Sequence, residues 1–443
     1  MKNVNDDTIF ALASAPGRAG VAVFRLSGPG AGAVLRVLTG AALPQPRKAV
    51  RARLSHGGDE IDDGLALWFP APASFTGEDV VELHLHGGRA VAQALTEALL
   101  AVGARPAQAG EFSRRAFLNG KLDLTRAEAI ADLVDAETAA QRRQALRQMD
   151  GGLARLVEEW RATLVRAMAL MEAAIDFSDE GIPDGVVETA AAAVATLSAD
   201  LRGHLVGDRP AERLRDGIHI AILGAPNAGK SSLLNRLAGR EAAIVAATAG
   251  TTRDVIEVHL DLHGWPVVVA DTAGLREAAE EIEAEGIRRA LARAEMADLK
   301  VAVFDATALP GLDSATVAVV DDATIVVVNK RDLATALPAM VAGRPAVACS
   351  ARDGEGIEAL VARLEAEVAA RFAVTEAPAL TRARHRSAVE ECLAALGSFD
   401  PGGPIELAAE ELRQAAAALA RITGRVDVED LLDVVFGEFC IGK

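Results

Sequence analysis

A glycine-rich segment that ends in a lysine and two serines is the strongest chemical signal in the sequence. Residues 224–232 read Gly-Ala-Pro-Asn-Ala-Gly-Lys-Ser-Ser, directly after an apolar run typical of a buried strand, and the pattern predicts a helix that begins at Ser232. In this context the segment is a P-loop, because its glycines let backbone N–H groups surround phosphate oxygens. We assign neutralisation of the β- and γ-phosphates to Lys230 and a hydroxyl ligand for Mg²⁺ to Ser231. The residues expected to contact the nucleotide here are Asn227, Ala228, Gly229, Lys230, Ser231 and Ser232.

Two further motifs follow in the order that a G protein requires. Gly250-Thr251-Thr252-Arg253-Asp254 predicts a loop that closes over the γ-phosphate, and we assign Thr252 as a second magnesium ligand with a catalytic role. Asp271 ends the predicted strand 267–270, so its carboxylate reaches the magnesium shell while the N–H of Gly274 meets the γ-phosphate. The residues expected at the nucleotide in these motifs are Thr251, Thr252, Asp271, Thr272, Ala273 and Gly274.

The base is read by two later segments. Asn329-Lys330-Arg331-Asp332 follows the predicted strand 324–328, and a carboxylate there accepts two hydrogens from the guanine edge that adenine does not offer. Cys349-Ser350-Ala351-Arg352 follows the next strand and places backbone N–H groups near the guanine carbonyl oxygen. The residues expected to bind the base are Asn329, Lys330, Asp332, Ser350 and Ala351. The sequence therefore predicts a GTP-hydrolysing enzyme with its nucleotide site between residues 217 and 372.

One position of the expected hydrolytic site departs from Ras-type GTPases. Leu275 stands where those proteins carry the glutamine that orients the attacking water, and leucine cannot hydrogen-bond water. Another residue must therefore orient it. An acidic stretch lies nearby at residues 277–285, although such a run is commonly a solvated helix start.

The elements that must position these motifs divide the chain into several units. Residues 217–372 alternate strands and helices and predict a doubly wound, Ras-like P-loop G domain. Short apolar runs and turn clusters before residue 120 predict an α+β domain, and alanine-rich helices follow up to residue 216. The tail 373–443 is helical but too short for a core of its own, so we infer that it packs on the earlier helices. The fold class is multidomain α/β plus α, with domains at 1–120, 121–216 with 373–443 as one discontinuous helical domain, and 217–372 inserted in it.

Composition limits the classes of function and the location of the protein. At 443 residues the chain suggests about three domains, and its net charge of −17 argues against nonspecific nucleic-acid binding by the whole surface. The basic groups Arg114 with Arg115, Arg142 with Arg143, and residues 382–386 could each be an RNA site or a solvated helix face, and we favour the solvated helix face. There is no apolar run of about 18 residues and no signal peptide, which predicts a cytoplasmic protein without a membrane span.

With these residues in hand, the chain resembles, from end to end, the tRNA-modification GTPase family called MnmE or TrmE. The matching segments are residues 16–18, 25–28, 75–79, 117–123, 227–232, 249–254, 271–276 and 439–443, the last reading Phe-Cys-Ile-Gly-Lys. The resemblance implies formation of the 5-carboxymethylaminomethyl group on the wobble uridine of certain tRNAs. It also implies a homodimer that works with a FAD-dependent partner, MnmG or GidA, in a heterotetramer or larger complex.

The resemblance further implies that the amino-terminal domain binds a tetrahydrofolate derivative, 5-formyl- or methylene-tetrahydrofolate, and mediates dimerisation. Carry-over places the folate contacts on Arg25, Glu82, Lys121 and Lys443. A pair of cations suits the glutamate tail of a folate, and a carboxylate suits its pterin. Without the resemblance, each of these residues would be interpreted as an ordinary surface charge.

Cysteine and histidine give weaker signals. The three cysteines, Cys349, Cys392 and Cys440, have no CxxC spacing and are expected to be reduced thiols. Cys440 matches the terminal cysteine of the family, and we favour a binding or positioning role over a covalent one. His84 and His86 share a strand face, but no third ligand is visible, which favours packing or a folate-pocket role over a metal site.

Potassium enters through the same resemblance, because family members bind this ion at the interface of paired G domains. Asn227 matches the ligating asparagine, and main-chain carbonyls of the loop 246–251 complete the site. The ligands implied are Asn227, Ala246, Thr248 and Thr251, and the loop residues implied at GTP are Ala246, Ala247, Thr248, Ala249 and Gly250. Glu283 matches the glutamate that orients water and, with Lys230 and Thr252, forms the expected catalytic set.

Two other functions remain open at this point. The first is a regulatory or ribosome-assembly GTPase without modifying activity, against which the folate-type residues and the terminal Cys-Ile-Gly-Lys argue. The second is a folate-dependent methylene transferase with a vestigial G domain, which the full set of GTP motifs disfavours. The expected mechanism has GTP and potassium draw two G domains together, with the movement relayed through the helices.

Overall fold

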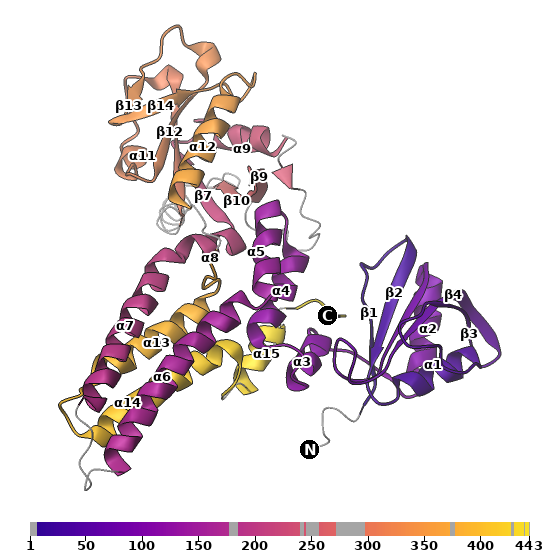
Figure 1. The fold of residues 1–443 in the computed structure, drawn as a ribbon. Helices are drawn as coiled ribbons and strands as arrows, with labels where there is room; N and C mark the ends of the chain where they lie inside the picture. Colours follow the sequence, from indigo (N-terminus) through magenta and orange to yellow (C-terminus); the bar gives the residue numbers. More distant parts are fainter. Residues whose placement is uncertain are drawn as a thin grey trace, which may run out of the picture. The chain divides into compact units, whose positions relative to one another are not determined.

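The computed structural model describes most of the chain (Figure 1). The described residues are 7–176, 185–239, 243–244, 257–271, 297–372, 377–426, 429–437 and 439–442. They form two compact units. The first comprises Met1–Ala131, Gln148–Leu197 and Glu391–Lys443, and the second comprises Asp132–Arg147 and Ser198–Glu390.

A six-stranded sheet opens the first unit. Its strands are β1 (Ile9–Leu12), β2 (Ala19–Ser27), β3 (Val50–His56), β4 (Asp59–Phe69), β5 (Val80–Gly87) and β6 (Arg105–Pro106). Their order is β3-β4-β5-β2-β1-β6, and only the β1–β6 pair is parallel. Alternate residues such as Phe24, Leu26 and Leu83 pack against helices α1 (Ala31–Thr39) and α2 (Arg89–Ala101). The expected α+β arrangement is present.

Helices from distant parts of the sequence form the rest of the first unit. The helices of the chain outside the two sheets are α3 (Glu111–Leu118), α4 (Leu124–Asp135), α5 (Ala139–Met149), α6 (Gly152–Asp176), α7 (Val186–Gly207), α13 (Ala383–Ser398), α14 (Ile405–Thr423) and α15 (Glu429–Gly437). Most of α5, the ends of α4 and α7 and the first half of α13 belong to the second unit. Helix α14 packs along α6, and ion pairs join Arg413 to Glu172 at 2.6 Å and Arg425 to Glu158 at 3.1 Å. Buried side chains on α6 recur every three or four residues, which gives it the apolar stripe that α14 covers. Helix α14 of the tail therefore lies against α6.

The carboxyl-terminal tail returns to the amino-terminal sheet. Ile441 forms an antiparallel bridge with Ala109, and a Cβ added to Gly442 would lie 2.7 Å from the carbonyl oxygen of Leu12 in β1. Upstream, the rings of Phe436 and Phe439 pack against each other at a tilt of 54°, with centroids 5.3 Å apart. Glycine is required at position 442, whose φ of +102° also disfavours other residues. The segment that carries Cys440 therefore lies beside the amino-terminal domain.

An eight-stranded sheet forms the core of the second unit, in the order β13-β14-β12-β11-β7-β10-β9-β8. The elements are α8 (Arg209–Asp216), β7 (Ile218–Gly224), α9 (Lys230–Ala238), β8 (Ala243–Ile244), β9 (Glu257–Leu262), β10 (Trp265–Asp271), β11 (Leu299–Asp305), η1 (Ala306–Ala308), α11 (Ser314–Ala318), β12 (Thr324–Asn329), η2 (Arg331–Leu333), β13 (Met340–Val341), β14 (Arg344–Ala348) and α12 (Ile357–Arg371). Strands β10, β7, β11, β12 and β14 run parallel, and every residue of β12 is buried. Their carboxyl ends share one edge of the sheet, where ligands of such folds bind.

Two interpretations of the basic groups are wrong. Arg115 is 1% exposed and pairs with Asp7, Glu78 and Glu111, so it belongs to a buried network and not to a solvated face. The 382–386 group is likewise taken up by ion pairs, with Arg382 on Asp132 and Arg386 on Glu212 at 2.7 and 3.0 Å. Apart from Glu111, which is four residues from Arg115 on the same helix, the carboxylates lie far away in sequence, so helical spacing gave no sign of them.

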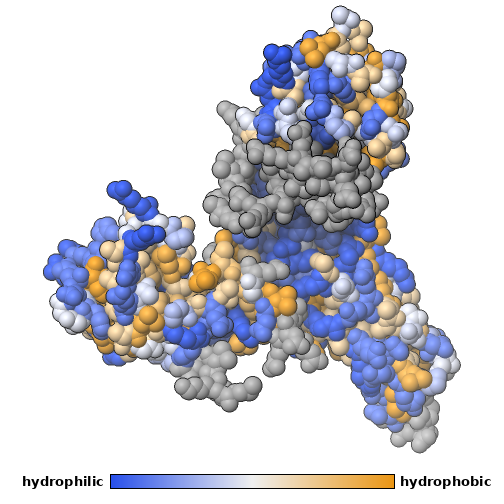
Figure 2. All heavy atoms as spheres, turned by 180° about the vertical axis from the view of Figure 1, so that it is seen from behind, coloured by the Kyte–Doolittle hydropathy of each residue, from blue (hydrophilic) through white to orange (hydrophobic). Residues whose placement is uncertain are grey.

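The visible surface of the described residues mixes hydrophilic and apolar side chains. Figure 2 shows hydrophilic side chains over most of it, with apolar ones scattered among them. In the part of the chain that the structure describes, no helix has both the length and the apolarity needed to cross a membrane.

Candidate functional site

The P-loop joins β7 to α9, as the motif predicts. The helix begins at Lys230, two residues earlier than the sequence pattern suggests, with Gly229 as its N-cap. Gly229 has a φ of +94°, and a Cβ there would lie 2.2 Å from Nδ2 of Asn329. No other residue fits this position. The first N–H groups of α9 and the positive end of its dipole therefore mark the phosphate site.

Lys230 is held inside this loop. The residue as a whole is 8% exposed. Its Nζ donates hydrogen bonds to the carbonyl oxygens of Gly224 and Ala225, both at 2.9 Å. Ala228 is buried beneath the loop, whereas Asn227 is exposed and has a φ of +61°. The left-handed backbone lets the side chain of Asn227 project from the loop, where asparagine tolerates this conformation better than most residues. The loop thus combines a confined ammonium with an exposed amide.

Asn329 ties the phosphate side of the site to the base side. It ends β12 and is 2% exposed. Its Nδ2 donates to the carbonyl oxygen of Ala228, and its Oδ1 accepts from the N–H of Ala351, each at 2.9 Å. Ser350 is fully buried, and its hydroxyl accepts a hydrogen bond from the N–H of Asp353 at 3.1 Å. One buried amide therefore holds the P-loop and the predicted base loop together.

Lys330 is positioned by a carboxylate that sequence reasoning missed. Its Nζ lies 2.6 Å from Oδ2 of Asp305, the last residue of β11, which is paired in register with Asn329. Burial works to raise the pKa of Asp305, but hydrogen bonds from Lys330 and Thr307 hold it below its ordinary value. The carboxylate is thus ionised at neutral pH. An aspartate at the carboxyl end of a predicted parallel strand was the signal that would have found it.

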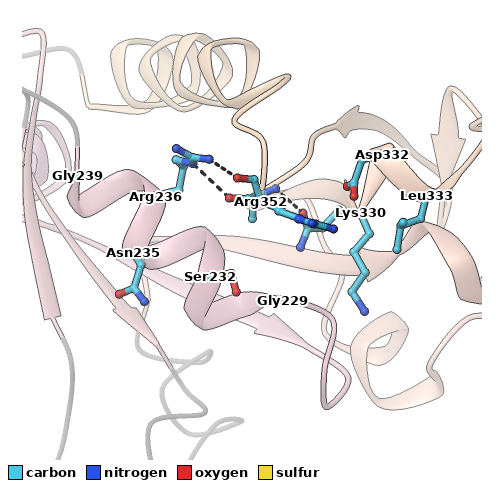
Figure 3. A pocket seen from close by; sticks show the side chains of 11 residues that line it. Gly229, Ser232, Asn235, Arg236, Gly239, Lys330, Asp332, Leu333 and Arg352 are labelled. Carbon is cyan, nitrogen blue, oxygen red and sulfur yellow. Dashed lines mark hydrogen bonds between the residues drawn. The ribbon is translucent and has the colours of Figure 1, made fainter.

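A cavity of about 660 Å³ joins these parts (Figure 3). Its lining residues are Gly229, Ser232, Asn235, Arg236, Gly239, Asn329, Lys330, Asp332, Leu333, Ala351 and Arg352. Figure 3 shows Ser232, Asn235 and Arg236 on α9, with Lys330, Asp332 and Leu333 beyond them. The volume is in the range of small-molecule sites. The structure therefore brings Gly229, Ser232, Asn329, Lys330, Asp332 and Ala351 of the predicted set to one cavity.

Arg236 is a second residue that sequence reasoning missed. Its guanidinium donates to the carbonyl oxygens of Ala351, at 3.2 Å, and of Arg352. It lies one helical turn after Ser232, so the i, i+4 spacing on α9 was a signal that it shares the same face. Arg236 supports the base loop, because both of its hydrogen bonds go to that loop's backbone.

Several predicted residues lie outside the described residues. They are Ala246, Ala247, Thr248, Ala249, Gly250, Thr251, Thr252, Thr272, Ala273, Gly274, Glu283 and Lys443. Asp271 is described as the last residue of β10. Magnesium ligation by Thr252, potassium ligation by the 246–251 loop and water orientation by Glu283 therefore stay predictions.

In the amino-terminal domain the structure brings Arg25 and Glu82 together. The two residues are paired across β2 and β5, and Nε and Nη2 of Arg25 lie 3.0 and 2.9 Å from Oε1 of Glu82. The guanidinium also lies over the rings of Phe75 and Phe112, at 5.6 and 5.9 Å from their centroids. Lys121 donates from Nζ to the carbonyl oxygen of Pro72 at 3.0 Å. Arg25 is therefore engaged with Glu82, and the two aromatic rings are a feature that the motif comparison did not supply.

The structure places both histidines beside carboxylates and two of the three cysteines in buried positions. His84 lies 3.5 Å from Glu82, and His86 lies 2.9 Å from Asp62. Among the described residues there is no group of three His, Cys, Asp or Glu side chains that would hold a metal ion. Cys349 and Cys392 are free and buried, and Cys440 is free and exposed.

Comparisons with known proteins cover the whole chain. Residues 8–121 match the family model described as the GTP-binding protein TrmE N-terminus, and residues 124–440 match the MnmE helical domain. The tRNA modification GTPase MnmE of Paramagnetospirillum magneticum is 68% identical over 439 residues, which cover 99% of this chain and 100% of that relative. The protein of the same name from Rhodospirillum rubrum is 56% identical over an alignment of 454 residues, which covers 99% of this chain and 99% of that relative.

Solved structures add no argument. The FeoB G-domain from Methanococcus jannaschii is 28% identical and covers 34% of this chain and 97% of that chain, but its TM-score is 0.27. Assignment rests on the full-length sequence matches and on the P-loop and base-loop geometry. The chain belongs to the MnmE family of tRNA modification GTPases.

Proposed function

We propose that this protein is a potassium-stimulated GTPase that, with a FAD-dependent partner of the MnmG type, adds a carboxymethylaminomethyl group to C5 of the wobble uridine of certain tRNAs. The observation that carries the proposal is the double hydrogen bond of Asn329, which joins the P-loop to the base loop across one cavity. A site built in this way binds a nucleoside triphosphate along its whole length. Asp332 in the cavity lining supplies the carboxylate that selects guanine.

Magnesium fits the residues on the phosphate side. Ser231 follows Lys230 in the first turn of α9, so its hydroxyl belongs to the helix end that receives the phosphates. Ser231 would hold a magnesium ion, which would supply positive charge against the phosphates, while Lys230 would hold the β- and γ-phosphates. Asn227 fits a potassium ion, because its amide side chain is exposed at the loop that carries those phosphates. We propose Ala246, Thr248 and Thr251 as the remaining potassium ligands and Glu283 as the residue that orients water.

The GTPase part of the proposal has a direct test. GTP turnover is measured for the purified chain in KCl and in NaCl at equal ionic strength, for wild type, Lys230→Ala and Glu283→Ala. We expect strong stimulation by potassium in wild type, loss of that stimulation in Glu283→Ala, and loss of turnover in Lys230→Ala. Equal, slow turnover of wild type in both salts would contradict the potassium mechanism and favour a regulatory GTPase without modifying activity.

A tetrahydrofolate derivative fits the amino-terminal domain in part. Glu82 offers a carboxylate to a pterin ring, Arg25 holds that carboxylate in place, and the partly exposed ring of Phe75 lies beside the Arg25 guanidinium. The bridge between Ile441 and Ala109 supports a role for the tail residues Cys440 and Lys443 at the same domain. We propose that the chain works as a homodimer in the cytoplasm, with the folate supplying a one-carbon unit.

The modifying activity is tested separately from GTP hydrolysis. The purified chain is combined with the FAD-dependent partner, GTP, a methylene-tetrahydrofolate and undermodified tRNA, and the nucleosides are analysed by mass spectrometry. We expect the carboxymethylaminomethyl uridine with wild type and its loss with Glu82→Gln, which keeps the shape but removes the charge. Retained tRNA modification in Lys230→Ala, together with lost GTP turnover, would instead support a folate-dependent transferase with a vestigial G domain.

A further inference from the structure

A second cavity in the G-domain unit has a lining that the GTP site does not explain. It has a volume of about 620 Å³ and is lined by Arg209, Glu212, Arg213, Asp298, Arg371, Phe372 and Arg386. These residues come from α8, from Asp298 directly before β11, from the end of α12 with the following Phe372, and from α13. None of them lines the GTP cavity. The cavity is therefore a separate site.

The lining carries an excess of positive charge in an acidic protein. Four arginines face two acids, although the whole chain has a net charge of −17. Both acids are already paired, because Arg213 lies 2.7 Å from Asp298 and Arg386 lies 3.0 Å from Glu212. The remaining guanidiniums are those of Arg209 and Arg371. The local balance favours an anion, which a chain of this overall charge would otherwise repel.

Arg209 and Arg371 differ in how many of their N–H groups are already bonded within the protein. Arg371 is bonded to Glu367 and to the carbonyl oxygen of Asp322, and it also offsets the negative end of the α12 dipole. Arg209 is exposed and, in the described part of the chain, makes no ion pair. Arg209 is therefore the guanidinium with the most capacity for a ligand.

The paired arginines are held in fixed positions before a ligand arrives. Asp298 accepts from Arg213 and also from the N–H of His219 at 3.0 Å, and Nη1 of Arg386 donates to the carbonyl oxygen of Leu205 at 2.8 Å. Ordering a long side chain costs about 0.5–1.5 kcal/mol on binding, and here that cost is largely met in folding. Fixed guanidinium planes suit phosphate oxygens, which they meet with paired N–H groups.

The aromatic side chain in the lining, Phe372, indicates that the ligand is a nucleotide and not a small anion. Phe372 is half-buried at the cavity, with its ring 6.4 Å from that of Trp265. An inorganic anion gains nothing from an aromatic wall, whereas RNA binders combine guanidiniums for phosphates with aromatic rings for bases. The volume lies in the range that accommodates one nucleotide.

We propose that this cavity binds a phosphate group of an RNA strand, with Arg209 as the principal contact and Phe372 beside the attached nucleoside. The identity of the RNA as tRNA rests on the proposed function. Four guanidiniums and two carboxylates line the site, and Arg209 makes no ion pair in the described part of the chain, so the site supplies local positive charge that tRNA needs on an acidic chain.

The test compares tRNA binding by wild type, Arg209→Ala and Arg209→Ala/Arg371→Ala over a series of KCl concentrations, by fluorescence anisotropy with unfractionated labelled tRNA. Arg202→Ala is the matched control, because Arg202 is an exposed arginine on α7 that does not line the cavity. We expect about 3- to 10-fold weaker binding for Arg209→Ala, and a slope of log affinity against log salt reduced by about 0.7–0.9 per lost contact. The control should bind as wild type does.

The outcomes separate this proposal from the proposed function. Wild-type affinity and slope in both cavity variants, or an equal loss in Arg202→Ala, would overturn the RNA site. So would a wild-type chain that binds no tRNA, or variants that lose affinity for inorganic phosphate while tRNA binding is unchanged. GTP turnover and melting temperature are measured on the same samples. Unchanged turnover with weakened tRNA binding supports the cavity, whereas absent turnover in wild type counts against the GTPase proposal alone.

Discussion

Substituting Asp305 tests whether this carboxylate prepares the GTP site. In the structure Asp305 holds Nζ of Lys330 at 2.6 Å and also accepts hydrogen bonds from the N–H and hydroxyl of Thr307. Asp305→Ala removes all of these bonds, whereas Asp305→Asn keeps an acceptor for Thr307 but removes the charge that fixes Lys330. Lys330 then has to be ordered when the nucleotide binds.

The magnitude follows from the exposure of the pair. The side chains of Lys330 and Asp305 are 31% and 20% exposed, so their attraction is screened less than at an open surface but not strongly enhanced. Immobilising one long side chain costs about 0.5–1.5 kcal/mol, which corresponds to about 2- to 12-fold in affinity. We expect GDP and GTP binding to weaken by this factor in both variants, because the base-side contact is common to both nucleotides.

The assay measures affinity by calorimetric titration with GDP and with a slowly hydrolysed GTP analogue. Asp313→Ala is the matched control, since Asp313 caps the short helix α11 in the same way, accepting from the N–H and hydroxyl of Thr316, but does not line the GTP cavity. Loss of that cap costs about 1 kcal/mol of stability and should leave affinity unchanged. Equal affinities in wild type, Asp305→Asn and Asp313→Ala would refute the positioning role.

Three further predictions concern other parts of the described structure. Gly229→Ala should weaken nucleotide binding more than 10-fold in the same titration, because its Cβ would lie 2.2 Å from the amide that joins the two loops, and wild-type affinity would disprove this. Burial raises the pKa of Cys392 to about 12, so a thiol reagent at pH 8 should label Cys440 first in the native chain, and rapid labelling of Cys392 would contradict the packing. The hydrogen bond to Asp208 raises the pKa of His204, so His204 stabilises the fold below its unfolded pKa of about 6.5 and this contribution is lost as pH rises through the folded value. His204→Gln should therefore lower the melting temperature more at pH 6 than at pH 9, and an equal loss at both would refute the ion pair.

Much of the GTP site was predictable because parallel strands end at one edge of a sheet. The P-loop follows β7 and the Asn329 motif follows β12, and the buried apolar runs of both strands are visible in the sequence. The P-loop start of α9 was placed two residues late, since a glycine with positive φ lets the helix begin at once. Apolar runs and turn motifs therefore predict the position of a motif to within a few residues.

The supporting contacts were not predictable in the same way. Lys330 and Asp305 are 25 residues apart, and Arg236 and Ala351 are 115 residues apart. No periodicity extends over such separations, because periodicity reports only which face of one element is apolar. The burial of Arg115 was missed for the same reason, since its partners Asp7 and Glu78 come from other elements.

The sequence by itself determined which chemistry the chain carries, through residue types at fixed spacing in the P-loop and in the Asn329 motif, and through its family motifs from residue 16 to residue 443. Only the tertiary structure decided which charged side chains form ion pairs with each other and which remain available to bind ligands. Arg25 is paired with Glu82 across two strands, while Arg209 keeps no ion-pair partner in the described part of the chain. The physical reason is that a charge's availability depends on the nearest opposite charge in space, and packing sets that distance.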